Sequence, residues 1–162
     1  MYVGYSPIIG VDTEKIFADF PDAHIIHVVR NPYSAYADTS KRPVPYSIPR
    51  YIHTWNIMQL YALGFAKMYP KNFHLIRFED LVENPKKLFN KLCEELGIEY
   101  DSTLEYPSWN GRKLEIIVPW GTVKKATSSA NRETSEELSR AEYEEIKKRT
   151  SITRSLLGYE RL

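Results

Sequence analysis

A run of apolar residues that ends on an arginine constrains the fold of this chain more than any other feature. The segment "HIIHVV", residues 24–29, contains no polar alternation apart from its two histidines. Such an unbroken run is typical of a strand that is covered on both faces, as in a parallel sheet. Arg30, Asn31 and Pro32 follow directly. The sequence therefore places a charged side chain at the carboxyl end of a buried strand.

A helix and a second strand complete the central unit. Apolar residues recur at helical spacing from about Arg50 to Met68, and Pro70 ends that helix. The segment "FHLIRFED", residues 73–80, predicts the second strand. Strand, helix and strand imply parallel pairing with a right-handed crossover. We expect an α/β fold with a small parallel sheet flanked by helices, in a single domain over residues 1–162.

A cap at Asp12 or Thr13, a capping box of Ser139 and Glu142, and flanking prolines and glycines predict three further helices. Between two of them lies a region without apolar periodicity, and a loop of that length inside a compact domain is usually functional or mobile. The helices are expected at residues 12–20, 85–96 and 139–157, and the loop region at residues 102–134.

Composition excludes several classes of protein. The formal net charge is +1, so no global field attracts nucleic acid or membrane, and any anion site must be local. The single cysteine, Cys93, excludes a disulfide framework and lies in an apolar helix stripe, which predicts a core thiol. No membrane-spanning run, signal peptide or metal-ligand spacing is recognisable. We expect a cytoplasmic protein without a metal.

Arg30 has two interpretations from spacing alone. Ligands of open α/β sheets collect outside the carboxyl ends of the strands, and the planar fork of an arginine suits a phosphate. Backbone amides and hydroxyls of the following residues, including Ser34, would add donors to the same anion. The alternative is a structural ion pair with Glu79 or Asp80, which end the second strand. The spacing does not decide between them.

Three segments in order carry a resemblance to a known family. They are "FPDAHIIHVVRNP", then "FHLIRFEDLVENPKKLFNKLCEELGI", and finally "ELSRAEYEEIKKRTSITRSLLGY". Together they resemble the carboxyl-terminal portion of sulfotransferases that use 3′-phosphoadenosine 5′-phosphosulfate (PAPS). The resemblance extends from about Asp12 to Tyr159. It implies a fold like that of P-loop NTPases, and transfer of a sulfuryl group to a hydroxyl or amine acceptor.

The resemblance also implies nucleotide-binding residues. Arg30 stands where the family binds the 3′-phosphate of PAPS or of its product PAP. The family has a serine eight residues further on, where this chain has Asp38. A carboxylate repels a phosphate unless it is protonated or turned away. A small shift would let Thr39 or Ser40 replace the serine.

Two more positions are similar to the family's nucleotide contacts. Phe78 stands at the aromatic position near the adenine. Gly121 and Thr122, in "GTV", are similar to the late nucleotide-binding loop, although Pro119 and Trp120 precede the glycine where the family has basic residues. An ordinary glycine turn is the alternative interpretation of this tripeptide.

The family's amino-terminal strand and phosphosulfate loop have no counterpart in "MYVGYSPIIG". The catalytic base of the family also lies upstream, so no catalytic residue is assigned and activity of this chain alone is uncertain. We expect an amino-terminally truncated domain in which another strand, a partner chain or self-association covers the open edge of residues 24–29. The alternatives are a non-catalytic interaction domain derived from this fold and a nucleotide-kinase-like fragment.

Overall fold

The computed structural model describes residues 3–4, 9–110, 112–114, 116–118, 121–123 and 128–159. For residues 9–11, 116–118, 121–123 and 128–131 it describes the backbone alone.

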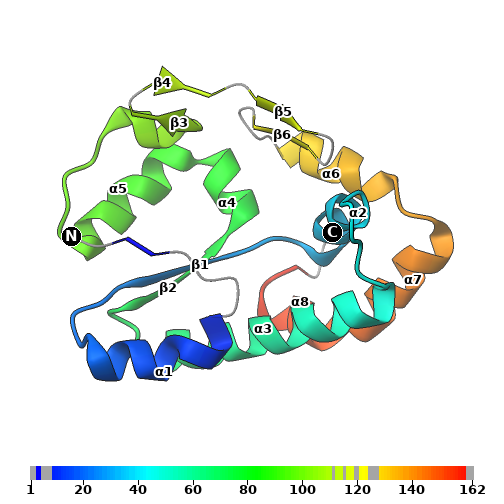
Figure 1. Ribbon diagram of the computed structural model, residues 1–162, viewed down its shortest axis with the longest axis horizontal. Helices are drawn as coiled ribbons and strands as arrows, with labels where there is room; N and C mark the ends of the chain where they lie inside the picture. The colour runs from blue at the N-terminus through cyan, green and yellow to red at the C-terminus, as the bar shows by residue number, and fades with distance from the viewer. Residues whose placement is uncertain are drawn as a thin grey trace.

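Two parallel strands and the helices that connect them form the centre of the fold. β1 (Ile25–Val29) pairs with β2 (Phe73–Arg77), in a register that sets Ile25 opposite Phe73. α2 (Pro32–Ser40) and the long α3 (Ile48–Met68) connect the two strands (Figure 1). The predicted parallel crossover unit, and with it the α/β class, is confirmed.

Helices lie on both sides of these strands, as Figure 1 shows. α1 (Ile9–Asp19) lies beside α3 on one side, and α4 (Phe78–Glu83) and α5 (Pro85–Leu96) rise on the other. Pro85 begins α5 and Gly97 ends it in the left-handed conformation, with φ 65°, as the sequence predicts. Cys93 is buried in this helix, as expected.

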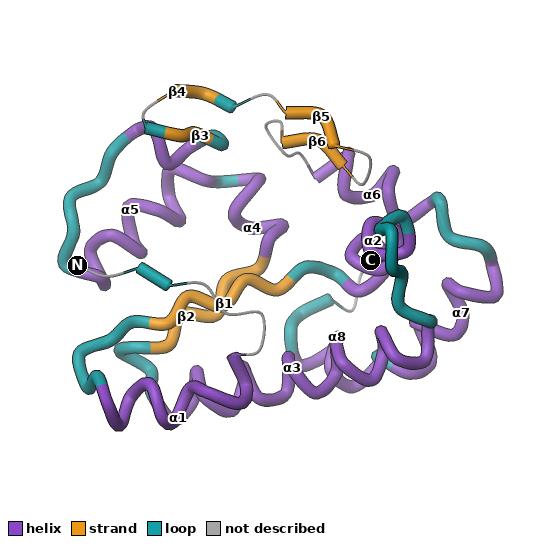
Figure 2. The backbone as a smooth tube through the Cα atoms, in the orientation of Figure 1, coloured by secondary structure: helices purple, strands orange, loops and turns teal. Residues whose placement is uncertain are grey.

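The part of the chain after α5 contains short elements, which Figure 2 shows as separate pairs of strands and as helices. Among the described residues, its strands pair with one another and not with β1. The elements are η1 (Ser102–Glu105), β3 (Ser108–Trp109), β4 (Arg112–Lys113), β5 (Ile116–Val118), β6 (Gly121–Val123), α6 (Ser128–Glu136), α7 (Arg140–Arg149) and α8 (Ser151–Leu156).

Two apolar clusters lie against α3. One joins the end of β1 to α2, α7 and the last residues, and it includes Val29, Trp55 and Tyr159. The other joins the start of both strands to α1, and it includes Ile25 and Phe73. Because α3 contributes to both clusters, it is the element that fixes the two strands relative to the carboxyl-terminal helices.

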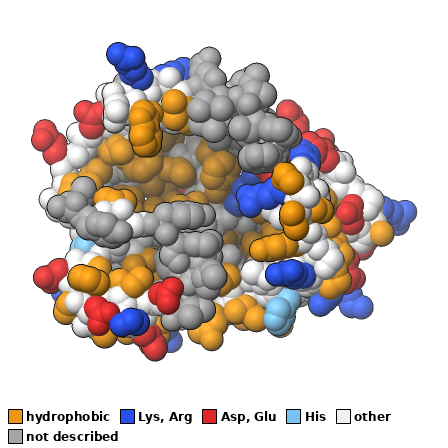
Figure 3. Space-filling model, viewed as in Figure 1, with side chains coloured by type: hydrophobic (Ala, Val, Ile, Leu, Met, Phe, Trp, Pro, Cys, Tyr) orange, Lys and Arg blue, Asp and Glu red, His pale blue; other side chains and the backbone are white. Residues whose placement is uncertain are grey.

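One face of β1 differs from the prediction. Ile25 and Val29 are buried, but Ile26 and Val28 are 44% and 48% exposed. The expectation that both faces are covered is therefore wrong for the described part of the chain, because the helices there cover one face of β1 and leave the other open. Figure 3 shows apolar side chains gathered in a hollow on the face that it presents.

Helix boundaries also differ from the predictions at three places. α1 begins before Asp12, so neither Asp12 nor Thr13 caps it. α6 is a helix inside the predicted loop region. The last helix begins with the predicted capping box of Ser139 and Glu142 but breaks at Thr150. The buried Thr150 hydroxyl donates to the Ile146 carbonyl, a bond within the helix that often bends it.

In the described part of the chain, no helix is long and apolar enough to cross a membrane. Those residues also contain no group of three or more His, Cys, Asp or Glu side chains that could hold a metal ion.

Candidate functional site

The turn between β1 and α2 positions Arg30. Asn31 is the N-cap of α2, and its side-chain oxygen accepts from the Ser34 amide at 3.0 Å and from the Ser34 hydroxyl at 2.8 Å. The Trp55 indole donates to the Arg30 carbonyl at 3.3 Å. An Asn-Pro pair is a recognised helix start, so the sequence carried the signal for α2. The backbone on both sides of Arg30 is therefore fixed.

The Arg30 side chain lies between a carboxylate and an aromatic ring. It forms an ion pair with Asp38, and its guanidinium carbon lies 5.1 Å from the centre of the Phe78 ring. The side chains of Arg30 and Asp38 are 24% and 28% exposed, so solvent reaches both. The structure thus brings together three residues that the sequence named as nucleotide contacts, one directly after β1, one in α2 and one in α4.

Thr39 and Ser40 lie in the last turn of α2. The Thr39 hydroxyl donates to the Ala35 carbonyl at 2.7 Å, and the Ser40 hydroxyl donates to the Ala37 carbonyl at 2.8 Å. Both hydroxyl protons are used within the helix. The carboxyl end of a helix also carries partial negative charge, which does not favour an anion. In this arrangement the two residues would have to rotate before they could donate to a phosphate.

A buried carboxylate stands next to Phe78. Glu79 accepts from the Asn31 amide at 3.0 Å, from the Asn31 side-chain amide at 3.1 Å and from the Tyr159 hydroxyl at 2.6 Å. Burial alone would raise the pKa of Glu79, but these hydrogen bonds outweigh burial and hold the pKa below its usual value. Glu79 is thus ionised and joins the ends of β1 and β2 to the carboxyl-terminal segment.

The contacts of Glu79 bear on the alternative interpretation of Arg30 as a structural ion-pair residue. The sequence offered Glu79 or Asp80 as its ion-pair partner, whereas Arg30 forms its ion pair with Asp38. Asp80 lies 3.7 Å from Arg77 instead. Sequence reasoning missed the role of Tyr159, because 80 residues separate it from Glu79 and no local spacing reports that contact.

Gly121 and Thr122 lie in β6. Gly121 is opposite Val118 and Thr122 is opposite Ile117 in the antiparallel pair with β5. Their side chains, together with Pro119 and Trp120, lie outside the described residues. Their role in a nucleotide site therefore stays a prediction.

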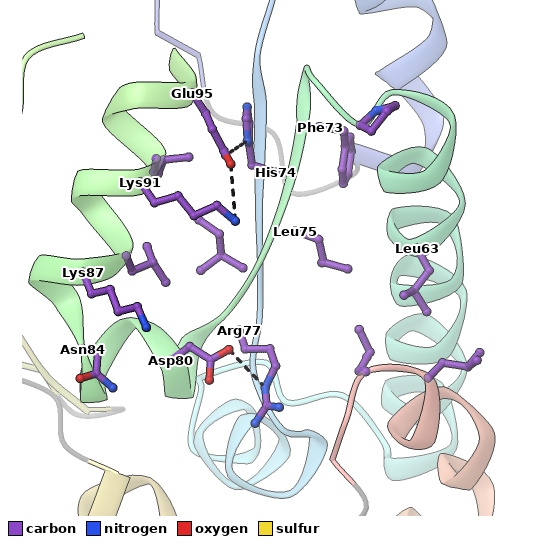
Figure 4. A pocket seen from close by; sticks show the side chains of 16 residues that line it. Leu63, Phe73, His74, Leu75, Arg77, Asp80, Asn84, Lys87, Lys91 and Glu95 are labelled. Atoms are coloured by element: carbon purple, nitrogen blue, oxygen red, sulfur yellow. Dashed lines mark hydrogen bonds and ion pairs between the residues drawn. The ribbon is translucent and has the colours of Figure 1, made fainter. Parts of the chain in front are cut away.

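The molecule also contains a cavity of about 680 Å³ beside β2, and Arg30 does not line it. Figure 4 shows α5 on one side of β2 and α3 on the other, with Lys87, Lys91 and Arg77 around the opening. This cavity is thus separate from the cluster of Arg30, Asp38 and Phe78.

Comparisons with known proteins place this geometry in a family. The protein-family model described as "Sulfotransferase family" matches residues 2–102, which is more than half of the chain. The fold is similar to a solved structure titled "Sulfotransferase Domain from the Curacin Biosynthetic Pathway", with a TM-score of 0.68 and 21% sequence identity. That match covers 96% of this chain and 61% of the other. A search of curated proteins gave no match. With its family resemblance confirmed, the chain belongs to the sulfotransferase family.

Proposed function

We propose that this chain forms the 3′-phosphoadenosine side of a PAPS site in a sulfotransferase, with Arg30 binding the 3′-phosphate. The observation that carries the proposal is the position of Arg30, partly exposed at the carboxyl end of β1 and beside the Phe78 ring. Parallel sheets bind ligands at this end. A planar guanidinium beside an aromatic ring offers one phosphate contact and one surface for a purine.

Asp38 limits the proposed affinity of this site for the nucleotide. It already forms an ion pair with Arg30, so a phosphate must displace the carboxylate or share the guanidinium with it. A phosphate with about two negative charges competes well for a bidentate cation, but the neighbouring carboxylate opposes it. We therefore expect weaker nucleotide binding than a serine at position 38 would give. Phe78, Thr39, Ser40, Gly121 and Thr122 are proposed as further contacts.

The reaction is sulfuryl transfer. An acceptor hydroxyl or amine attacks sulfur in line, the bond from sulfur to the bridging phosphate oxygen breaks, and a base takes the acceptor's proton. The leaving group is PAP.

The edge of β1 is the proposed place for the phosphosulfate loop. Backbone donors and a lysine hold the phosphosulfate in this family, and residues 1–162 contain no such motif. Among the described strands β1 pairs only with β2, so its other edge is open, which supports the proposal that a further strand pairs there, supplied by a partner chain, by self-association or by another segment of the protein.

Calorimetry with PAP tests the nucleotide site. We expect weak binding to the unmodified chain and at least about tenfold weaker binding to Arg30→Ala, because a charge-assisted contact to phosphate is lost. Arg149→Ala is the matched control: Arg149 pairs with Glu145 on the surface of α7, away from this site, so affinity should not change. Equal affinity in Arg30→Ala, or no binding to the unmodified chain, would contradict the proposal. Transfer from labelled PAPS measures turnover separately, and we expect little from this chain alone.

A further inference from the structure

The outer edge of β2 lacks a strand partner among the described residues. β2 pairs with β1 along one edge. The Asn72 carbonyl accepts from Ile25 in β1, whereas the Phe73 amide donates away from β1, to the Tyr69 carbonyl. In a parallel pair the amide and carbonyl of one residue point to the same side, and successive residues alternate. Phe73, Leu75 and Arg77 therefore direct their backbone groups away from β1.

The cavity beside β2 lies along this edge. Its lining includes the five consecutive residues of β2, and consecutive residues of a strand face both sides of a sheet. Leu88 and Leu92 of α5 line one side of it, and Leu63 of α3 lines the other. Figure 4 shows β2 between these two helices. The cavity is thus a groove with a backbone edge at its base and leucine side chains on both walls.

The α5 wall is held in place at one end. His74 is buried, with one ring nitrogen 2.9 Å from His24 and the other 3.0 Å from Glu95 of α5. This chain of contacts ties β2 to the last turn of α5. The width of the groove is thereby set at this end without a ligand, which lowers the entropic cost of binding one.

The charged groups at the opening favour an acidic ligand. Arg77 lies 3.7 Å from Asp80, and Lys91 lies 3.5 Å from Glu95. Lys87 also lines the groove and has no ion-pair partner in the described part of the chain. The opening thus carries one cation more than its carboxylates neutralise.

We propose that this groove is a docking site for an extended, acidic peptide of a partner protein, which adds to β2 as a third strand. Strand addition uses the free backbone groups for affinity and alternate side chains for specificity. The leucine walls would take apolar side chains, and Lys87 would take a carboxylate. A single extended segment suits the groove, because helices on both sides leave no room for the folded body of a second copy. This site is independent of the proposed nucleotide site.

The test uses acetyl-Glu-Val-Glu-Val-Glu-Val-amide as the probe. Binding is measured by calorimetry and by amide hydrogen exchange of Leu75, which should slow when the peptide is bound. Lys87→Glu should weaken binding about fivefold, as expected for reversal of one exposed charge. Lys86→Glu is the matched control, because Lys86 is adjacent in α5 but does not line the groove; its effect should stay below about twofold.

A second peptide separates strand addition from other occupants. The same sequence with an N-methyl group on every residue keeps the side chains but loses its backbone donors on both edges, and it should not bind. Retained binding would overturn the proposal in favour of an amphiphile site. Three other results would also overturn the proposal. One is absence of binding by the first peptide, and another is an equal loss of affinity for it in Lys86→Glu and Lys87→Glu. The third is amide exchange of Leu75 that slows as the protein concentration rises in the absence of peptide.

Discussion

Two carboxylates lie near the carboxyl end of β1, and they differ in what surrounds them. Glu79 is 7% exposed and accepts three hydrogen bonds from Asn31 and Tyr159. Asp38 has a side chain that is 28% exposed, and its ion pairs are with Arg30 and, at 3.8 Å, with Lys41. The first carboxylate holds segments of the fold together, whereas the second neutralises a cation. Near one strand end, the carboxylate that joins segments of the fold and the carboxylate that pairs with Arg30 are thus different residues.

Glu79→Ala should produce the largest loss of stability. It leaves the Asn31 amide and the Tyr159 hydroxyl without their acceptor in a buried place, and the expected cost is about 3 kcal/mol. Urea denaturation measures it. Asp38→Ala is the comparison variant and should cost less than about 1 kcal/mol, because a partly exposed ion pair contributes little. Similar losses in the two variants would show that the contrast between the carboxylates is mistaken.

Tyr159→Phe should have an intermediate effect. It removes one hydrogen bond to a charged group, at a cost of about 2 kcal/mol, while the ring keeps its packing. It should also raise the pKa of Glu79, because that bond is among the contacts that lower it. If the Tyr159→Phe variant is as stable as the unmodified protein, the hydrogen bonds from Asn31 suffice to satisfy Glu79.

The pH dependence of stability follows from the same carboxylate. The pKa of Glu79 is lower in the folded state than its usual value of 4.5, so the unfolded chain binds the proton more readily. The stabilisation is therefore complete above about pH 4.5 and is lost as the pH falls through the folded pKa. Glu79→Gln should be less stable than the unmodified chain at pH 7, and the difference should shrink in acid. A difference that stays constant from pH 7 to pH 3 would contradict this account.

The central unit could be predicted because its signals are local. An apolar run, a long helical stripe and a second run are each local in the sequence, and they predict β1, α3 and β2, although residues 78–80 of the predicted second strand begin α4 instead. The same run predicted that both faces of β1 are covered, and Ile26 and Val28 are exposed. A strand's composition reports the environment that it requires. It does not report which segment provides that environment.

The candidate site could be predicted in part. Arg30 was named from its place at a strand end and Phe78 from the family resemblance, and the structure brings them within cation–π distance. The ion pair with Asp38 depends on α2, which Asn31 and Pro32 signal but which the predicted elements did not include. The contact of Tyr159 with Glu79 depends on the path of the whole carboxyl-terminal region. Contacts of that range follow from packing and leave no periodic signal.

Asp38→Ser should lower stability by the smallest amount of these variants, and it should raise the affinity for the nucleotide. Stability should fall by less than about 1 kcal/mol, because one partly exposed ion pair is lost. Affinity for PAP should rise by about tenfold, which corresponds to removal of about 1.4 kcal/mol of repulsion between a carboxylate and a phosphate on the same guanidinium. Calorimetry at low and high salt measures both the gain and its origin.

Salt provides the control for this last comparison. Asp38→Asn keeps the size of the side chain and removes its charge, so it should gain nearly as much affinity as Asp38→Ser if repulsion is the cause. The gain of both variants should shrink at 1 M salt, where charges more than about 3 Å apart are screened. A gain in Asp38→Ser alone, unchanged by salt, would instead assign the effect to a new hydroxyl contact. No gain in either variant would mean that Asp38 turns away when the nucleotide binds and that Arg30 is already available to it.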